Sequence, residues 1–169
     1  MMNYNLENKN CDWFQAIRTG QLEFIAESFG ELNINMINEY GQSLLHEAIS
    51  YRQKEIAIEL LKQSIDVNIQ DKDGKTVLHY INFYPDTEIT KMILENGGDV
   101  TLKDLYGNIP LWYAVFNARG KYEIVELLIE YKSNATSKNN TGRTPLDFAV
   151  QINDETLMNI LSVQCDGYN

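Results

Sequence analysis

The feature that most constrains this chain is a motif that returns four times at nearly constant spacing. The turn glycines that mark it are Gly41, Gly74, Gly107 and Gly142, which are 33, 33 and 35 residues apart. A leucine follows each glycine by four residues, and an apolar cluster with helical spacing comes later in each copy. A period of about 20–50 residues is typical of proteins that stack one small unit on the next. The period therefore predicts an elongated array in which each unit packs against its neighbours.

Each copy is expected to form two short helices and a turn. Ser43, Thr76 and Thr144 stand where the first helix begins, and a hydroxyl there accepts a hydrogen bond from a free amide of the first turn. Pro110 and Pro145 fall at first helical positions, where a missing amide costs nothing. The second helix carries its apolar residues at a helical period.

The second helices are expected to end on a residue in the left-handed conformation. Gly97 adopts it without a steric penalty. Ser64 and Lys132 occupy the equivalent positions, at an expected cost of about 1 kcal/mol each.

The motif resembles that of the ankyrin repeats. The family pattern of Gly, then Thr-Pro-Leu-His-x-Ala, appears as GQSLLHEA at 41–48, GKTVLHYI at 74–81, GNIPLWYA at 107–114 and GRTPLDFA at 142–149. A degenerate leading unit without the turn glycine lies at about 10–37. The resemblance implies an all-α fold, an ankyrin-repeat solenoid of stacked helix-turn-helix units joined by β-turn hairpin tips.

The resemblance covers nearly the whole chain and predicts one domain, 1–169. The expected repeats are about 10–37 (N-terminal cap), 38–70, 71–103, 104–138 and 139–165 (C-terminal cap). Two copies depart from the pattern. Two extra residues within 117–123 predict a longer loop between two helices, and Ile81 and Asn82 replace the usual small alanines.

Charge and cysteine content exclude several classes of function. The chain has 14 basic and 24 acidic residues, a net charge of −10, which argues against binding to nucleic acid or to an anionic membrane surface. Cys11 and Cys165 are too few for a disulfide framework, and since they fall in opposite end repeats, no bridge between them is expected. No secretory signal or membrane-length apolar stretch is visible, so a cytoplasmic location is expected.

No catalytic, metal or cofactor motif is expected to operate here. His46 and His79 occupy the same place in two repeats, which could be a metal or acid–base pair. The resemblance implies instead that each ring bonds to the backbone of a loop. The acidic run before Gly74 fails the register of a calcium-binding EF-hand loop, and phosphate-binding and nucleophile motifs are missing. The chain is therefore predicted not to be an enzyme and to need no cofactor.

The resemblance implies that a partner protein is bound through the hairpin tips and the exposed side of the first helices. The residues placed there by register are Tyr40, Gln42, Tyr51, Lys72, Asp73, Lys75, Phe83, Tyr84, Lys103, Tyr106, Asn108, Phe116, Asn117 and Arg143. Six of them are aromatic, and exposed aromatic residues mark interfaces. The alternative is that some of them, Phe83 and Phe116 above all, pack between repeats.

The charges divide between the two sides of the predicted array. Bases exceed acids among the tips and first helices, where Arg18 and Lys138 add to the basic residues above. The second helices carry Glu55, Glu59, Glu88, Glu95, Glu123, Glu126 and Glu130. This acidic side is interpreted as a solvated outer face. Docking of the partner there is the alternative.

Three classes of function follow. The first is an inhibitor that binds and neutralises a cognate toxin or effector protein, as in immunity proteins, which small ankyrin proteins resemble. The second is a scaffold or adaptor that joins two proteins and inhibits neither. The third, a small enzyme or ligand carrier, requires an apolar cavity with convergent polar groups.

Overall fold

The computed structural model describes residues 12–30 and 33–162, so Cys11 and Cys165 lie outside the described residues. Within those residues the chain forms ten α-helices and one 3-10 helix. They are α1 (Trp13–Arg18), α2 (Leu22–Glu27), α3 (Leu44–Ser50), α4 (Lys54–Lys62), α5 (Val77–Tyr80), η1 (Ile81–Phe83), α6 (Thr87–Glu95), α7 (Pro110–Asn117), α8 (Glu123–Glu130), α9 (Pro145–Gln151) and α10 (Glu155–Ser162).

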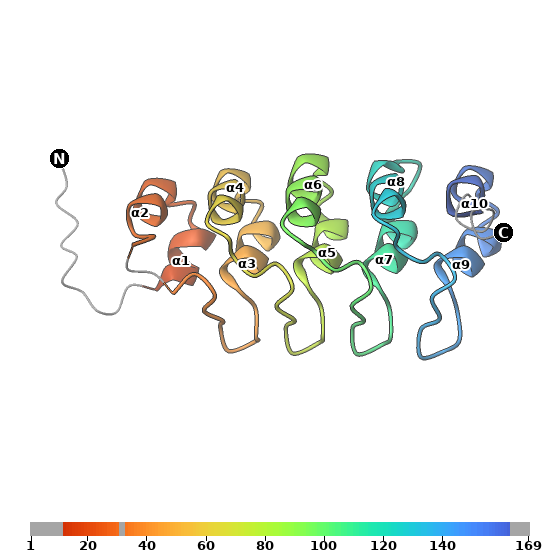
Figure 1. Cartoon of the computed structure of the whole chain (residues 1–169), viewed down its shortest axis with the longest axis horizontal. Coiled ribbons are helices and arrows are strands. Elements are labelled where there is room, and N and C mark those ends of the chain that lie inside the picture. Colours follow the sequence, from red (N-terminus) through yellow and green to blue (C-terminus); the bar gives the residue numbers. More distant parts are fainter. Residues whose placement is uncertain (1–11, 31–32, 163–169) are drawn as a thin grey trace.

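The helices form antiparallel pairs that stand side by side in one row (Figure 1). The first helices of the pairs pack on one another in one layer, made of α1, α3, α5, α7 and α9. The second helices form another layer beside it, made of α2, α4, α6, α8 and α10. Four hairpin loops project from the row to the same side. The all-α stack of helix pairs predicted from the period is therefore confirmed.

The core runs between the two layers through the length of the row. The repeated leucine of the first helices is fully buried at Leu45, Leu78 and Leu111. It belongs to the same buried cluster as apolar residues of the second helices that are also fully buried, namely Leu60, Ile93, Leu128 and Leu161. Each unit thus hides its apolar residues against its neighbours, as expected of a repeat array.

The expected helix starts and ends are present. The hydroxyl of Ser43 accepts a hydrogen bond from the amide of His46, and Pro110 and Pro145 are first residues of their helices. The left-handed ends are confirmed at Gly97, Ser64 and Lys132, whose φ values are 86°, 57° and 67°.

A short polar side chain organises each hairpin tip. These residues stand three positions before the turn glycines: Asn38, Asp71, Asp104 and Asn139. In the second tip, Asp71 Oδ1 accepts hydrogen bonds from the amides of Asp73 and Lys75 at 2.9 and 2.8 Å, and the Asp71 amide donates to the Lys75 carbonyl at 2.9 Å. The other three tips repeat this pattern. The shape of each tip is therefore determined within the loop itself.

Both departures from the repeat pattern have structural consequences. Five residues separate α7 from α8, whereas three separate α3 from α4, which confirms the longer loop. In the copy with Ile81 and Asn82, the first helix ends at Tyr80 and continues as the 3-10 turn η1. Ile81 is buried there, and Asn82 Nδ2 donates to the Leu78 and Pro110 carbonyls at 2.9 and 3.2 Å.

Candidate functional site

The hairpin tips are joined to one another by backbone hydrogen bonds. The Lys72 amide donates to the Tyr40 carbonyl, Leu105 to Asp73, and Asn140 to Tyr106, each at 2.9 Å. These bonds link each tip to the next one, and the four tips project from the same edge of the array (Figure 1). The backbone of the tips is therefore held in place before any partner arrives, and preorganisation of this kind lowers the entropic cost of binding.

The two histidines hold the tips onto the helices. Nδ1 of His46 accepts a hydrogen bond from the Ser43 amide at 3.1 Å, and Nε2 lies 3.1 Å from the Lys75 carbonyl of the next tip. Since a carbonyl only accepts, this geometry assigns the proton to Nε2. His79 makes the same contacts one repeat later, ending on the Asn108 carbonyl at 3.2 Å. The prediction that each histidine ring bonds to the backbone of a loop is therefore confirmed.

Burial keeps both imidazoles neutral. Desolvation lowers the pKa of His46 to about 4 and also lowers the pKa of His79, against the hydrogen bonds to the loop carbonyls, which act to raise them. Across the part of the chain that the structure describes, His, Cys, Asp and Glu form no group of three or more able to hold a metal ion.

Tyrosine side chains from two of the first helices donate hydrogen bonds to the carboxylates that organise the tips. The Tyr80 hydroxyl donates to Asp71 Oδ2 at 2.7 Å, and the Tyr113 hydroxyl donates to Asp104 Oδ2 at 2.6 Å. Burial, together with these carboxylates, raises the pKa of both phenols. The second and third tips are thereby tied to their own repeats as well as to the tips that follow them.

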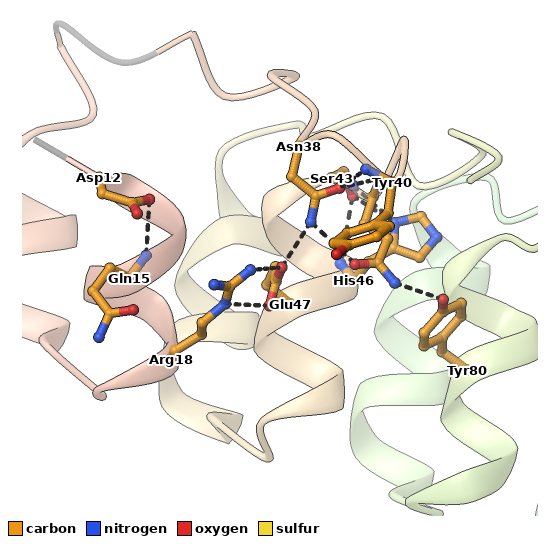
Figure 2. A network of polar contacts seen from close by, with 10 residues as sticks. Asp12, Gln15, Arg18, Asn38, Tyr40, Ser43, His46, Glu47 and Tyr80 are labelled. Carbon is orange, nitrogen blue, oxygen red and sulfur yellow. Dashed lines mark hydrogen bonds and ion pairs between the residues drawn. The ribbon is translucent and has the colours of Figure 1, made fainter. Parts of the chain in front are cut away.

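A partly buried ion pair takes the place of these tyrosine contacts at the first tip (Figure 2). Glu47 occupies the place of the two tyrosines and is 3% exposed. Its carboxylate accepts from Arg18 Nη2 at 2.7 Å, from Arg18 Nε at 3.1 Å and from Asn38 Nδ2 at 2.8 Å. The hydrogen bonds to Glu47 raise the pKa of the Arg18 guanidinium. The positive charge that Arg18 was expected to add to this face is thus paired.

All six aromatic residues singled out from the sequence lie at the surface. Tyr40 and Tyr106 belong to the tips, and Tyr51, Phe83, Tyr84 and Phe116 lie at or just after the ends of first helices. Their exposed fractions range from 36% for Tyr84 to 65% for Tyr106. Phe83 and Phe116 also contact the next repeat, with ring centroids 5.9 Å from Tyr113 and 5.2 Å from Phe148. Packing between repeats therefore takes up only part of each of these two rings.

Except for Asn108, the polar residues of the predicted site fall into two groups, one exposed and one partly buried. Lys72, Asp73, Lys103 and Arg143 are exposed. The partly buried members are Gln42, Lys75 and Asn117. Gln42 Nε2 donates to the Tyr80 hydroxyl at 2.8 Å, and Lys75 Nζ lies 3.5 Å from the Asp73 carboxylate. Asn117 Nδ2 donates to the Tyr113 carbonyl at 3.0 Å.

Asn108 differs from the rest of the predicted site. Its exposed fraction is 8%, and its side-chain oxygen accepts from Asn139 Nδ2 of the next tip at 3.0 Å. The structure therefore places Asn108 between two tips and away from the outer surface. Of the exposed bases, Lys103 donates to the Lys138 carbonyl at 2.7 Å and Arg143 to the Gln151 side chain.

Four exposed apolar residues extend the surface beyond the predicted set. They are Ile37, Leu105, Val150 and Ile152. Leu105 directly precedes Tyr106 in the third tip and has the same exposed fraction of 65%. Its position in the repeat is the sequence signal that identifies it as a tip residue. Val150 lies in the final turn of α9, the first helix of the C-terminal pair, and Ile152 directly follows that helix.

The opposite side of the array is acidic. All seven glutamates of the second helices named above are exposed except Glu59, which is half-buried. Lys62 and Lys91 pair with Glu59 and Glu95 at 2.7 and 3.8 Å within their own helices. The two sides of the array therefore differ in chemistry, one aromatic and the other acidic.

Two comparisons with known proteins bear on identity. A family model described as ankyrin repeats, in three copies, matches residues 13–104 and again 81–168. A search of curated proteins finds no match. Within the described residues no helix is long and apolar enough to cross a membrane. The matched segments together span nearly the whole chain, and with the stacked helix pairs and hairpin tips they show that the chain belongs to the ankyrin-repeat family.

Proposed function

We propose that the chain is a single ankyrin-repeat domain that binds another protein without catalysis. Ankyrin repeats mediate contacts between proteins, and that general role comes with the family. The proposed docking face consists of the hairpin tips and the exposed side of the first helices, with Tyr40, Tyr51, Phe83, Tyr84, Tyr106 and Phe116 as its anchors. The exposed bases Lys72, Lys103 and Arg143 supply its rim.

One observation carries this placement. The six aromatic side chains keep 36–65% of their surface exposed, whereas the repeated leucines of α3, α5 and α7 are fully buried. Exposed aromatic side chains on a rigid frame are typical of binding hot spots, because they bury much area and lose little conformational entropy. The linked tips supply that frame.

The most concrete form of the proposed function is inhibition. A preorganised face that covers a functional surface of its partner blocks that surface by occupying it. From the resemblance of small ankyrin proteins to immunity proteins, the proposed partner is a toxin or effector protein that the chain neutralises, in a cytoplasmic setting. The competing proposal is a scaffold, which the chemical difference between the aromatic and acidic sides favours, since two unlike faces suit two partners.

The placement is tested by alanine substitution. The partner is first isolated by capture on the full chain, and its affinity is measured by isothermal titration calorimetry. Tyr84→Ala and Tyr106→Ala are each expected to weaken binding by more than about 1 kcal/mol. Glu126→Ala and Glu130→Ala, on exposed positions of α8, serve as matched controls and are expected to have no effect.

The outcome also separates the two proposals. Unchanged affinity in both tyrosine variants, with their unfolding curves intact, would rule out the proposed face. Loss of the captured partner's own activity on binding supports inhibition. A ternary complex in which a second protein occupies the acidic side while the first stays active supports the scaffold.

A further inference from the structure

A groove of about 370 Å³ opens between the second and third helix pairs, where the first helices meet the loops that follow them. Its floor is aliphatic and includes Ile49, Ile81 and Ile89, all of which are otherwise buried. Phe83 and Tyr84 line it as well and remain 50% and 36% exposed. The groove thus joins the buried core to the proposed docking face.

The groove lies beside the repeat that carries Ile81 in place of a small alanine. Its lining includes Phe83, the last residue of the 3-10 turn η1, and the segment 84–86 that follows it and contains Pro85. In the neighbouring repeat the first helix α3 continues to Ser50 without such a turn. The altered loop presents two aromatic rings beside the groove, whereas the preceding loop presents Tyr51 and Arg52.

The cations at the groove differ in their partners. Lys54 Nζ lies 2.8 Å from Asp86 Oδ2 and 2.9 Å from Glu88 Oε2, so two carboxylates already surround this single ammonium group. The Arg52 guanidinium lies over the Tyr84 ring, 4.4 Å from the centroid, and forms no ion pair with any residue that the structure describes. The ring orients the guanidinium and leaves its N–H donors available to an incoming carboxylate.

We propose that this groove receives an apolar side chain of the partner protein that has an Asp or Glu one or two positions away, whose carboxylate pairs with Arg52. This inference rests on the proposed function, because the partner reaches the groove from the docking face. The aliphatic floor favours an apolar group, and the planar guanidinium favours a carboxylate that it binds through two parallel hydrogen bonds. Apolar burial gives affinity, and the charge pair selects the segment.

The test uses random linear peptides displayed on phage and selected on the immobilised full chain. Enriched peptides are expected to share an aliphatic or aromatic residue with an acidic residue within two positions. Synthetic copies are then measured by fluorescence polarisation. Arg52→Glu is expected to lower their affinity at least about tenfold, and replacing the acidic residue of the peptide by Lys is expected to restore binding to this variant.

Arg119→Glu is the matched control. Arg119 is an exposed arginine in the α7–α8 loop with a left-handed φ of 45°, compared with 58° for Arg52, and it does not line the groove. Its substitution is expected to leave peptide affinity unchanged. The amide analogue of the acidic peptide residue tests the same contact on the unaltered chain, so the test does not depend on the folding of a variant.

Three results would overturn the proposal: no enrichment, enriched peptides without the apolar–acidic pair, or peptides that bind the Arg52→Glu variant as tightly as the original chain. Peptides whose binding depends on Tyr106 and not on Arg52 would reject the groove and leave the proposed protein-binding function intact. Loss of partner binding by Arg52→Glu with unchanged affinity for Tyr106→Ala would keep the groove and remove Tyr106 from the proposed docking face.

Discussion

Protonation of His46 is expected to make the stability of the array depend on pH in the mildly acidic range. The ring is buried, it accepts a hydrogen bond on Nδ1, and its pKa falls from 6.5 to about 4 on folding. The unfolded chain therefore binds a proton at a pH where the folded chain does not. The stabilisation from the neutral ring is complete above the unfolded pKa and is lost as the pH falls toward the folded pKa.

The shift sets the size of the effect. A difference of about 2.5 pKa units corresponds to about 3 kcal/mol over the full range, of which about 2 kcal/mol falls between pH 7 and pH 5. His79 shifts in the same direction and adds to the slope. His46→Gln removes one titrating group and keeps a donor and an acceptor, so this variant is expected to be less stable at pH 7 and to lose less stability on acidification.

Urea unfolding followed by far-UV circular dichroism at pH 7, 6 and 5 measures this difference. Carboxylates contribute to the pH dependence of both proteins, and their contribution cancels when the two slopes are subtracted. The same slope for the original chain and for His46→Gln, or a His46 imidazole that titrates near 6.5 by NMR in the folded chain, would refute the reasoning.

Two further predictions concern the frame that holds the docking face. Gly107→Ala is expected to cost clearly more than the about 1 kcal/mol of an unfavourable left-handed residue, because an added Cβ would lie 2.8 Å from the Asn140 amide nitrogen. Gly120→Ala, which also has a positive φ but has no heavy atom within 4 Å of its added Cβ, is the control, and equal losses in urea unfolding would contradict the proposed close approach of the tips. Arg18→Met is expected to destabilise the chain by about 2 kcal/mol, because it leaves the buried Glu47 carboxylate with Asn38 alone, and the partial exposure of Arg18 keeps the cost below that of a fully buried pair. Adding Glu47→Gln is expected to recover part of this loss in thermal unfolding, and an Arg18→Met variant as stable as the original chain would show that the pair contributes nothing.

The fold followed from the sequence because a repeat imposes the same demands many times. The turn glycines, the leucine four residues later and the helix starts each recur, so chance agreement in one copy is corrected by the others. The left-handed ends at Ser64 and Lys132 were predictable in the same way, by alignment with Gly97. Exposure of the six aromatic residues followed from the register alone.

The parts that escaped prediction depend on contacts between repeats. Glu47 reads as one more surface acid in the sequence, and only its contact with Arg18, 29 positions earlier, makes it part of a partly buried ion pair. The burial of Asn108 has the same origin, since it lies against Asn139 of the next tip. The groove beside Arg52 requires the 3-10 turn in the following repeat, and the replacement of alanine by Ile81 and Asn82 signalled a departure there without revealing its shape.

Hydroxyl-radical footprinting of the full chain, free and bound to its captured partner, tests the central claim most directly. It reports the solvent exposure of individual side chains and is most sensitive to aromatic ones. If the aromatic face binds the partner, Tyr40, Tyr106 and Phe116 lose reactivity in the complex and the side chains of α8 do not change. Protection confined to the second helices, with undiminished reactivity at the three aromatic residues, would contradict the account.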